Sequence, residues 1–220
     1  MADHSRTYAI GRRRWLGFSV LAVAVVSLAT VVSFSTTVAA FDAALGSLAR
    51  TDQWGSLVTF SHDISALAST DLIIPVTATA VALLALVRHW HGALTLALSV
   101  LATQAVVHLV KVLVERPRPE ANDGMTAAGG HSFPSAHSAT AVALYLTLAL
   151  VVAHRCTGWV RAAVLGAGGA VVMAIGLSRI QLGAHYPLDV VAGWLTGAAL
   201  VLAIWALVGR LAVRPAPRPA

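Results

Sequence analysis

The chain has 220 residues, of which 58% are hydrophobic and only 11% are charged, and its formal net charge at pH 7 is +6. In an average soluble domain about 25% of the residues are charged, so this composition excludes a soluble globular protein and indicates a membrane protein. The one cysteine, Cys156, excludes an internal disulfide bond and a cysteine metal cluster.

Uncharged apolar runs predict the fold, which we expect to be an all-α integral membrane bundle of six transmembrane helices. In chain order the runs cover residues 15–41, 72–87, 92–110, 138–153, 162–177 and 190–209. Several runs are slightly shorter than the roughly 20 residues that cross about 30 Å of hydrocarbon, so their ends are expected to lie under loops. The run at 72–87 is the least typical, since Asp71 precedes it and Pro75 lies inside it.

The first run follows three arginines and ends in small residues, as a cleaved signal peptide does, but its apolar core is too long for one. We therefore expect a permanent first helix after a cytoplasmic segment at 1–14. Residues 42–71 are expected to form an outer connection with an interfacial helix, and 210–220 a disordered cytoplasmic tail. No linker or repeat divides the sequence, so 1–220 is predicted to be a single domain.

The basic residues lie at helix ends and form no basic face, which argues against nucleic acid as a partner. With the N-terminus inside, ten of the fifteen basic residues fall in cytoplasmic segments, as the positive-inside rule requires. These ten are Arg6, Arg12, Arg13, Arg14, Arg88, Arg155, Arg161, Arg210, Arg214 and Arg218. The sequence thus predicts a multi-pass protein of the plasma membrane with both termini cytoplasmic. The motif residues described next then lie on the outer face.

Three cations flank two connections on that outer face. Lys111 is the only lysine of the chain, and six residues separate it from the Arg118-Pro119 pair, while Arg179 follows Ser178 after the fifth run. Arginine binds phosphate oxygens through two parallel N–H groups and lysine adds a compact charge, so together they suit a phosphate dianion. Each of them alone could equally be a cation that reaches the membrane surface from a helix end.

The segment 115–137 contains three prolines and several glycines, so it is expected to be a shaped loop outside the membrane. Ser135 and Ala136 stand at its end, where the fourth helix is expected to begin. Free backbone N–H groups at a helix N-terminus bind anions, so these residues predict a phosphate cradle, although Ser135 could be a plain N-cap. His137, in the first turn of that helix, could protonate a leaving group or be an interfacial histidine.

His185 and Asp189 are four residues apart across the start of the sixth helix, where Pro187 suits the first turn. With this spacing the carboxylate can hold one imidazole nitrogen and leave the other free as a nucleophile. The same pair could also be a structural cap. Of the other histidines, His131 matches no motif, and His108 is expected to be a buried, hydrogen-bonded residue of the third helix.

Taken together, these stretches resemble the type 2 phosphatidic acid phosphatase superfamily, which includes lipid phosphatases and shares its site with vanadium haloperoxidases. The family pattern is Lys, six residues, Arg-Pro; then Pro-Ser-Gly-His; then Ser-Arg, five residues, His, three residues, Asp. The first and third parts match at 111–119 and 178–189 without a gap. In the middle part, at 134–137, Ala136 replaces the usual glycine.

The resemblance implies a role for each matching residue. His185 would attack phosphorus to form a phosphohistidine, Asp189 would orient it, and His137 would protonate the leaving group and then activate water. The groups that would bind the phosphoryl oxygens are Lys111, Arg118, Ser135, Ala136 and Arg179. No metal and no other cofactor is expected, because these cations supply the charge that a metal supplies elsewhere.

The sequence therefore predicts a metal-independent membrane phosphatase that hydrolyses a lipid phosphate or lipid pyrophosphate at the outer leaflet. By resemblance, the candidate substrates are polyprenyl pyrophosphate, phosphatidic acid and phosphatidylglycerophosphate, with the lipid tail remaining in the bilayer. Two alternatives stay open: a phosphotransferase that passes the phosphoryl group to an alcohol, and a non-catalytic transporter that recognises phosphate. The oligomeric state does not follow from the sequence.

Overall fold

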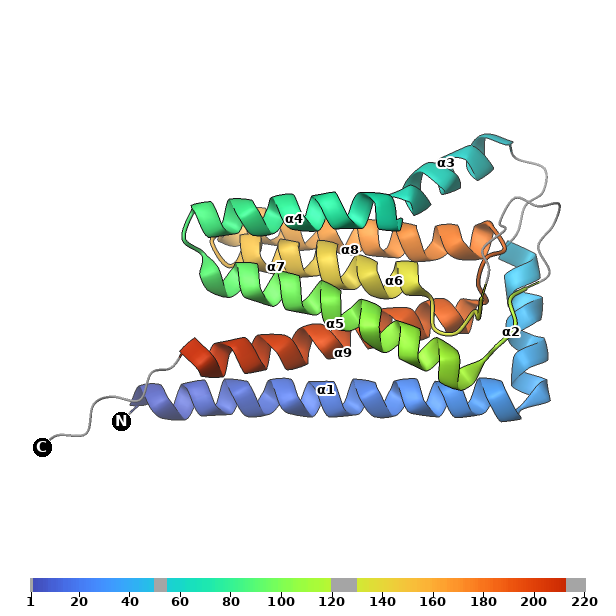
Figure 1. Cartoon of the computed structure of the whole chain (residues 1–220), viewed down its shortest axis with the longest axis horizontal. Helices are drawn as coiled ribbons and strands as arrows, with labels where there is room; N and C mark the ends of the chain where they lie inside the picture. Colours follow the sequence, from blue (N-terminus) through green and yellow to red (C-terminus); the bar gives the residue numbers. More distant parts are fainter. Residues whose placement is uncertain (1, 50–54, 120–129, 213–220) are drawn as a thin grey trace, which may run out of the picture.

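The computed structural model describes residues 2–49, 55–119 and 130–212, and every regular element in these ranges is a helix (Figure 1). The all-α prediction is therefore confirmed. The helices follow the predicted runs closely in the second half of the chain and differ from them in the first half.

Two helices stand where the sequence predicted one apolar run at 15–41. The first, α1, covers Ala2–Phe34, and the second, α2, covers Thr36–Ala49. Ser35 separates them, and its hydroxyl accepts a hydrogen bond from the backbone N–H of Val38 at 3.3 Å, which is the geometry of a helix N-cap. The prediction of one unbroken helix was wrong. Hydropathy stays high across Ser35, so the apolar run gives no sign of the break that the side-chain cap of Ser35 marks.

The segment predicted as an outer connection, 42–71, is largely helical where it is described. It contains the second half of α2 and all of α3, Gly55–Ala66, which meets α4, Thr70–Leu86, at a bend of 45°. With 17 residues, α4 alone is about 26 Å long, slightly less than the roughly 30 Å of a hydrocarbon core. This run is helical as predicted, although Pro75 lies inside it. Because α4 is short, it forms a candidate span only together with α3.

The remaining helices match the other predicted runs. They are α5, Trp90–Val114; the segment formed by α6, Ala136–Ala141, a π-helical turn η1, Val142–Leu146, and α7, Thr147–Ala153; α8, Gly158–Gln181; and α9, Pro187–Ala212. Since α9 continues through Ala212, the prediction of a disordered tail from residue 210 was wrong for its first residues. The rest of that tail, 213–220, lies outside the described residues.

By length and composition the described chain contains five helices able to cross a membrane, and six if the bent pair α3–α4 counts as one span. The five are Trp15–Phe34, Trp90–Val114, Ala136–Ala153, Gly158–Gln181 and Pro187–Leu211. The protein is a multi-pass membrane bundle.

The two ends of the bundle differ in what they carry. In Figure 1 the long helices lie side by side, and α2 lies across one end of them, almost at right angles. The described parts of the α5–α6 and α8–α9 connections lie at this same end, whereas α1 begins and α9 ends at the opposite one. Both predicted motif loops therefore share one end of the bundle, opposite the helix ends nearest the chain termini.

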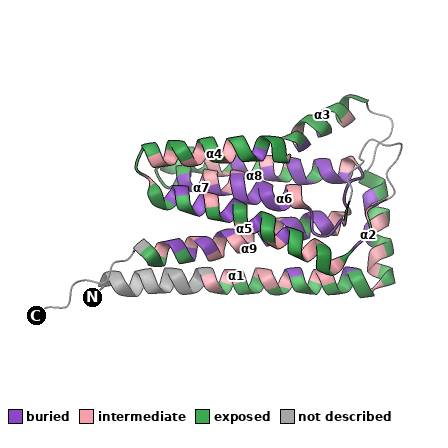
Figure 2. Cartoon of the chain, viewed as in Figure 1, coloured by how far each residue is buried: buried purple, intermediate pink, exposed green. Residues whose placement is uncertain are grey.

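The buried core runs along α6, η1, α8 and α9 (Figure 2). One apolar cluster joins Ala141 and Val142 to Ile175 and Val201, and a second joins Leu144 to Leu96 on α5. In contrast, α1 and α4 expose many of their residues (Figure 2), as expected for helices whose outer faces meet lipid.

Small residues let α9 approach α6 closely. A Cβ atom placed on Gly193 would lie 2.5 Å from the carbonyl oxygen of Ser135, and one on Gly197 would lie 2.5 Å from that of Ala139. Both contacts are with backbone atoms that cannot move aside. Glycines four residues apart allow such close helix crossings in membranes, so this pair fixes the position of α6 on α9.

We predict that Gly193→Ala destabilises the protein, because its methyl group would force α6 and α9 apart. The expected cost is about 1–3 kcal/mol, as for other overpacked sites. It would appear as a lower Tm of the purified protein in detergent. The matched control is Gly169→Ala on α8, where a Cβ atom would meet nothing within 4 Å. Equal Tm values for the two variants would contradict this account of the helix contact.

Candidate active site

The three motif stretches converge at the end of the bundle that α2 covers. One terminal nitrogen of Arg118 lies 3.4 Å from Nε2 of His185, and Nδ1 of His185 lies 3.6 Å from Asp189. The backbone N–H of Ser135 donates a hydrogen bond to the carbonyl oxygen of Asp189 at 2.9 Å. Residues of all three stretches therefore lie together.

Lys111 reaches the site from the last turn of α5. The helix ends at Glu115, which has a left-handed backbone with φ of 49° and turns the chain toward the bundle. The Nζ atom of Lys111 donates a hydrogen bond to the carbonyl oxygen of His131 at 2.5 Å. This bond fixes the ammonium group beside the described end of the loop that leads to α6.

Arg118 bridges the two motif loops. Its Nε donates to the carbonyl oxygen of Gly130 at 3.1 Å, and one terminal nitrogen donates to that of Ala184 at 2.8 Å. The same terminal nitrogen lies 3.4 Å from Nε2 of His185. Burial lowers the pKa of Arg118, and an arginine stays charged in proteins despite such shifts. The guanidinium group is thus held directly against the imidazole.

Arg179 is buried at the end of α8 and donates a hydrogen bond to the hydroxyl of Ser65 on α3. Its Nε is buried and has no hydrogen-bond partner among the described residues. A guanidinium N–H that makes no hydrogen bond within the described protein can donate to a phosphate oxygen.

Ser135 caps α6 and joins it to the loop before α9. Its hydroxyl accepts hydrogen bonds from the backbone N–H of Ser138 at 3.4 Å and from its hydroxyl at 3.0 Å, and its own N–H donates to the carbonyl oxygen of Asp189 at 2.9 Å. Phe133, fully buried against Val32 and Ala192, anchors this segment to α1 and α9. Ser135 is therefore an N-cap, and its hydrogen bond to Asp189 places it beside the third motif stretch.

Ala136 is the first residue of α6 and has no left-handed backbone; in the described chain the non-glycine residues with positive φ are Arg88 and Glu115. The position therefore does not require the conformational freedom of glycine. The backbone N–H at the helix N-terminus remains available to an anion. His137 follows in the first turn and is partly exposed.

His185 is 2% exposed and lies between a carboxylate and a guanidinium group. Its Nδ1 is 3.6 Å from Oδ2 of Asp189, while Nε2 faces Arg118. The first distance exceeds a hydrogen bond, but catalytic hydrogen bonds are often long without substrate. Burial lowers the pKa of His185 from 6.5 to about 4, although Asp189 opposes this shift. The imidazole is therefore neutral at pH 7.

The sequence prediction missed two residues of this site, Arg116 and Asp42. Arg116 donates to Oδ1 of Asp189 at 2.6 Å and to Oδ2 of Asp42 at 2.9 Å, and both carboxylates are fully buried. Arg116 was part of the first motif stretch but was given no role, and Asp42 was placed in the outer connection. The one available signal was a charged residue inside the apolar run of α2.

Two histidines outside the motifs, His131 and His108, lie in different surroundings. The carbonyl group of His131 binds Lys111. The side chain of His108 is exposed on α5, so the prediction that it is buried was wrong. A single polar residue in an apolar run does not indicate which face of the helix it occupies.

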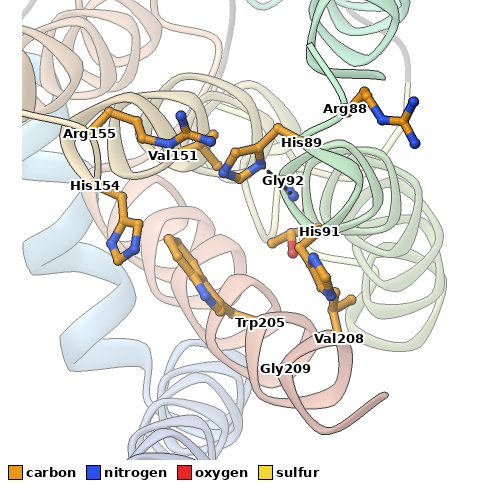
Figure 3. A pocket seen from close by; sticks show the side chains of 11 residues that line it. Arg88, His89, His91, Gly92, Val151, His154, Arg155, Trp205, Val208 and Gly209 are labelled. Carbon is orange, nitrogen blue, oxygen red and sulfur yellow. Dashed lines mark hydrogen bonds between the residues drawn. The ribbon is translucent and has the colours of Figure 1, made fainter. Parts of the chain in front are cut away.

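A separate cavity of about 450 Å³ lies at the opposite end of the bundle. Its lining includes His89, His91, His154, Arg155 and Trp205 (Figure 3), and none of the motif residues belongs to it. In the described part of the chain, no group of three or more His, Cys, Asp or Glu residues is placed to hold a metal ion. The candidate active site is therefore the cationic group under α2.

Two curated relatives are lipid A 1-phosphatases. Over 118 residues the chain is 33% identical to the protein of Rhizobium etli, and the match covers 50% of this chain and 47% of that protein. Over 123 residues it is 32% identical to the protein of Rhizobium johnstonii, covering 52% and 46%. The chain thus matches about half the length of these relatives.

Two solved structures share the fold. A PAP2 type phosphatidylglycerolphosphate phosphatase from Bacillus subtilis superposes with a TM-score of 0.77 at 23% identity, covering 85% of this chain and 93% of that one. LpxE of Aquifex aeolicus superposes with a TM-score of 0.55 at 25% identity, covering 76% and 93%. Residues 92–212, more than half of the chain and all three motif stretches, match the PAP2 superfamily. The chain belongs to the PAP2 superfamily.

Proposed function

We propose that this protein is a metal-independent phosphatase that hydrolyses a lipid phosphate or lipid pyrophosphate through a phosphohistidine at His185. The observation that carries the proposal is that the two nitrogens of this imidazole face different groups. Nδ1 faces the carboxylate of Asp189, and Nε2 faces the guanidinium group of Arg118, which can bind a phosphate oxygen. A neutral imidazole held in this way has one nitrogen free to attack phosphorus.

The cations around His185 supply the binding energy for the phosphoryl group. Arg118, Arg179 and Lys111 can each donate to an equatorial oxygen, and their charges interact with one another. Lys111 and Arg118 donate to backbone carbonyl groups. A phosphate dianion would be a stronger acceptor than these neutral carbonyl groups, because charge-assisted hydrogen bonds are about twice as strong.

In the first half of the reaction, Nε2 of His185 forms a bond to phosphorus as the bond from phosphorus to the leaving oxygen breaks. His137 gives its proton to that oxygen, and the alcohol or lipid phosphate leaves. Asp189 accepts the Nδ1 proton in a hydrogen bond and stabilises the positive charge that develops on the ring. The cations bind the charge on the phosphoryl oxygens in the transition state.

In the second half, a water molecule attacks the phosphorus of the phosphohistidine. His137, now neutral, accepts a proton from this water, and the bond from Nε2 to phosphorus breaks. Inorganic phosphate leaves and His185 returns to its neutral form. The same group acts first as an acid and then as a base, so its protonation state is restored in each cycle.

A lipid substrate fits the surroundings of the site. An apolar cavity of about 360 Å³ lies between α3 and α8, with Phe60, Ile64 and Leu177 in its lining. It reaches Ser178, which directly precedes Arg179. An acyl or prenyl chain could lie in this cavity, along the same α3–α8 contact where Arg179 donates a hydrogen bond to Ser65. The names of the relatives, lipid A 1-phosphatase and phosphatidylglycerolphosphate phosphatase, support a lipid substrate without selecting one.

We further propose that the active site faces the outer side of the plasma membrane. The motif loops lie at the end of the bundle opposite the start of α1 and the end of α9 (Figure 1). The positive-inside rule places those helix ends in the cytoplasm.

The phosphohistidine is tested by trapping it. With an aryl phosphate, whose leaving group needs no proton, His137→Ala should still form the phosphoenzyme but hydrolyse it about 10²–10⁴ times more slowly. The expected result is an acid-labile, base-stable phosphoprotein in His137→Ala and none in His185→Ala, which should lose phosphate release about a thousandfold or more.

The matched control for this experiment is His154→Ala, an exposed histidine at the other end of the bundle, which should release phosphate at the normal rate. A panel of lipid phosphates and pyrophosphates then identifies the substrate. Phosphate release that persists in folded His185→Ala would reassign the nucleophile, and phosphoryl transfer to an added alcohol without free phosphate would make the protein a transferase.

The proposed role of the cations predicts how a metal chelator and vanadate change the rate of phosphate release. Since the charge on the phosphoryl oxygens is bound by Lys111, Arg118 and Arg179, phosphate release in detergent should change by less than about twofold in EDTA. Vanadate, which adopts the geometry of phosphorus under attack, should inhibit it. A requirement for added magnesium would contradict this site.

The pH dependence tests the protonation state of the nucleophile. Burial lowers the pKa of His185 to about 4, so the reactive neutral ring is lost only when the pH falls toward that value. The second ionisation of a phosphate monoester, near pH 6, must first be corrected for. After this correction, kcat/KM should show no acid limb from the enzyme between pH 5 and 7. A limb at the ordinary histidine pKa of about 6.5 would disagree.

A further inference from the structure

A buried row of charges extends the site beyond the residues of the family motif. Asp42 on α2 is fully buried, as is Asp189 on α9, and Arg116 between them is 7% exposed. The two aspartates are 147 residues apart in sequence, by the difference of their numbers, and each binds a different terminal nitrogen of the same guanidinium group. Arg116 thus has a carboxylate on either side.

Every carboxylate oxygen in this row has a defined partner. The guanidinium carbon of Arg116 also lies 4.2 Å from the ring centre of Tyr186. The second oxygen of Asp42 accepts a hydrogen bond from the backbone N–H of Leu188 at 2.9 Å, and the second oxygen of Asp189 accepts one from Tyr186 at 3.0 Å. That second oxygen of Asp189 is the one that faces Nδ1 of His185. Each carboxylate is therefore fixed in rotation as well as in position.

The charges in the row determine what Asp189 can do for the nucleophile. Arg116 alone would neutralise Asp189 and weaken its attraction for a positive charge on His185. Asp42 removes this effect, because two carboxylates and one guanidinium group leave a net charge of −1 on the row. Nearby charges act strongly in a site shielded from water, so this net charge favours the imidazolium that develops during attack.

Stability alone is a poor explanation for such a row. Removing charged groups from water costs several kcal/mol for each ion, and well-packed neutral residues are often as stable as a buried ion pair. A structural link between α2 and α9 would need only a neutral hydrogen bond. The observed arrangement, two carboxylates on one arginine, costs more than such a link and delivers a charge to the catalytic histidine.

We propose that Arg116 and Asp42 are positioning residues for the nucleophile: Arg116 holds Asp189 in place, and Asp42 balances its charge so that Asp189 can stabilise the positive charge on His185. This inference rests on the proposed phosphohistidine mechanism. It gives α2 a catalytic purpose, since this helix carries the balancing charge into the site.

The test is a double-mutant cycle on kcat. Asp42→Asn leaves a net charge of 0 on the row and so weakens the attraction for the imidazolium, whereas Arg116→Gln removes the hydrogen bond that holds Asp189. Each single variant should therefore lower kcat about tenfold or more, with KM changed by less than about threefold. The double variant returns the net charge to −1, so its loss of kcat should be smaller than the product of the two single losses.

Rates are expressed per folded molecule, from the amount of phosphoenzyme formed in a burst, so that a loss of protein does not count as a loss of kcat. The matched control is Asp63→Asn, the same substitution at an exposed aspartate of α3, which should keep normal kcat. If a single variant does not fold, the double variant, whose pair is neutral, still reports on the charge balance against the wild-type protein.

The outcomes separate this inference from the proposed function. A wild-type protein that releases no phosphate, or releases it independently of His185, would overturn the proposed function and the positioning role with it. Normal kcat in Asp42→Asn beside an active wild-type protein would overturn the positioning role alone. So would a double variant whose loss of kcat equals the product of the two single losses, because residues that act independently have multiplicative effects on kcat.

Discussion

The structure of this site depends on the interactions of Asp189, which joins the three motif stretches. Its carboxylate accepts a hydrogen bond from Arg116 of the first stretch and faces His185 of the third. Its carbonyl oxygen accepts a hydrogen bond from the backbone N–H of Ser135 in the second. Because one residue at the start of α9 contacts all three stretches, the described parts of the two loops converge on it.

A cluster of cations in a partly buried site is unfavourable by itself, and hydrogen bonds to the backbone reduce this cost. Lys111 and Arg118 donate to the backbone carbonyl groups of His131, Gly130 and Ala184. The negative row of Asp42, Arg116 and Asp189 lies on the other side of His185. The cations are thus already oriented before the substrate arrives, which avoids part of the entropy of arranging them during the reaction.

Much of this arrangement could be predicted from the sequence, because apolar runs and short motifs are local signals. The spans at 92–110 and 190–209 and the positions of His185 and Arg118 follow from them. The break at Ser35 could not be predicted, since one hydroxyl cap changes the chain direction without changing hydropathy. Nor could the role of Asp42: its bond to Arg116 joins residues 74 apart in sequence, and only tertiary packing brings them together.

The close packing of α6 against α9 sets the distances between the groups of the site. Asp189, Gly193 and Gly197 are each four residues apart, so they lie along one face of this helix. The two glycines meet the backbone of α6 at Ser135 and Ala139. The face that brings α6 close therefore also carries the carboxylate that lies 3.6 Å from Nδ1 of His185. A shift of one turn between these helices, about 5.4 Å, would separate Ser135 from Asp189. The contact between Ser135 and Asp189 thus depends on Gly193 and Gly197, which have no side chains to hold α6 and α9 apart.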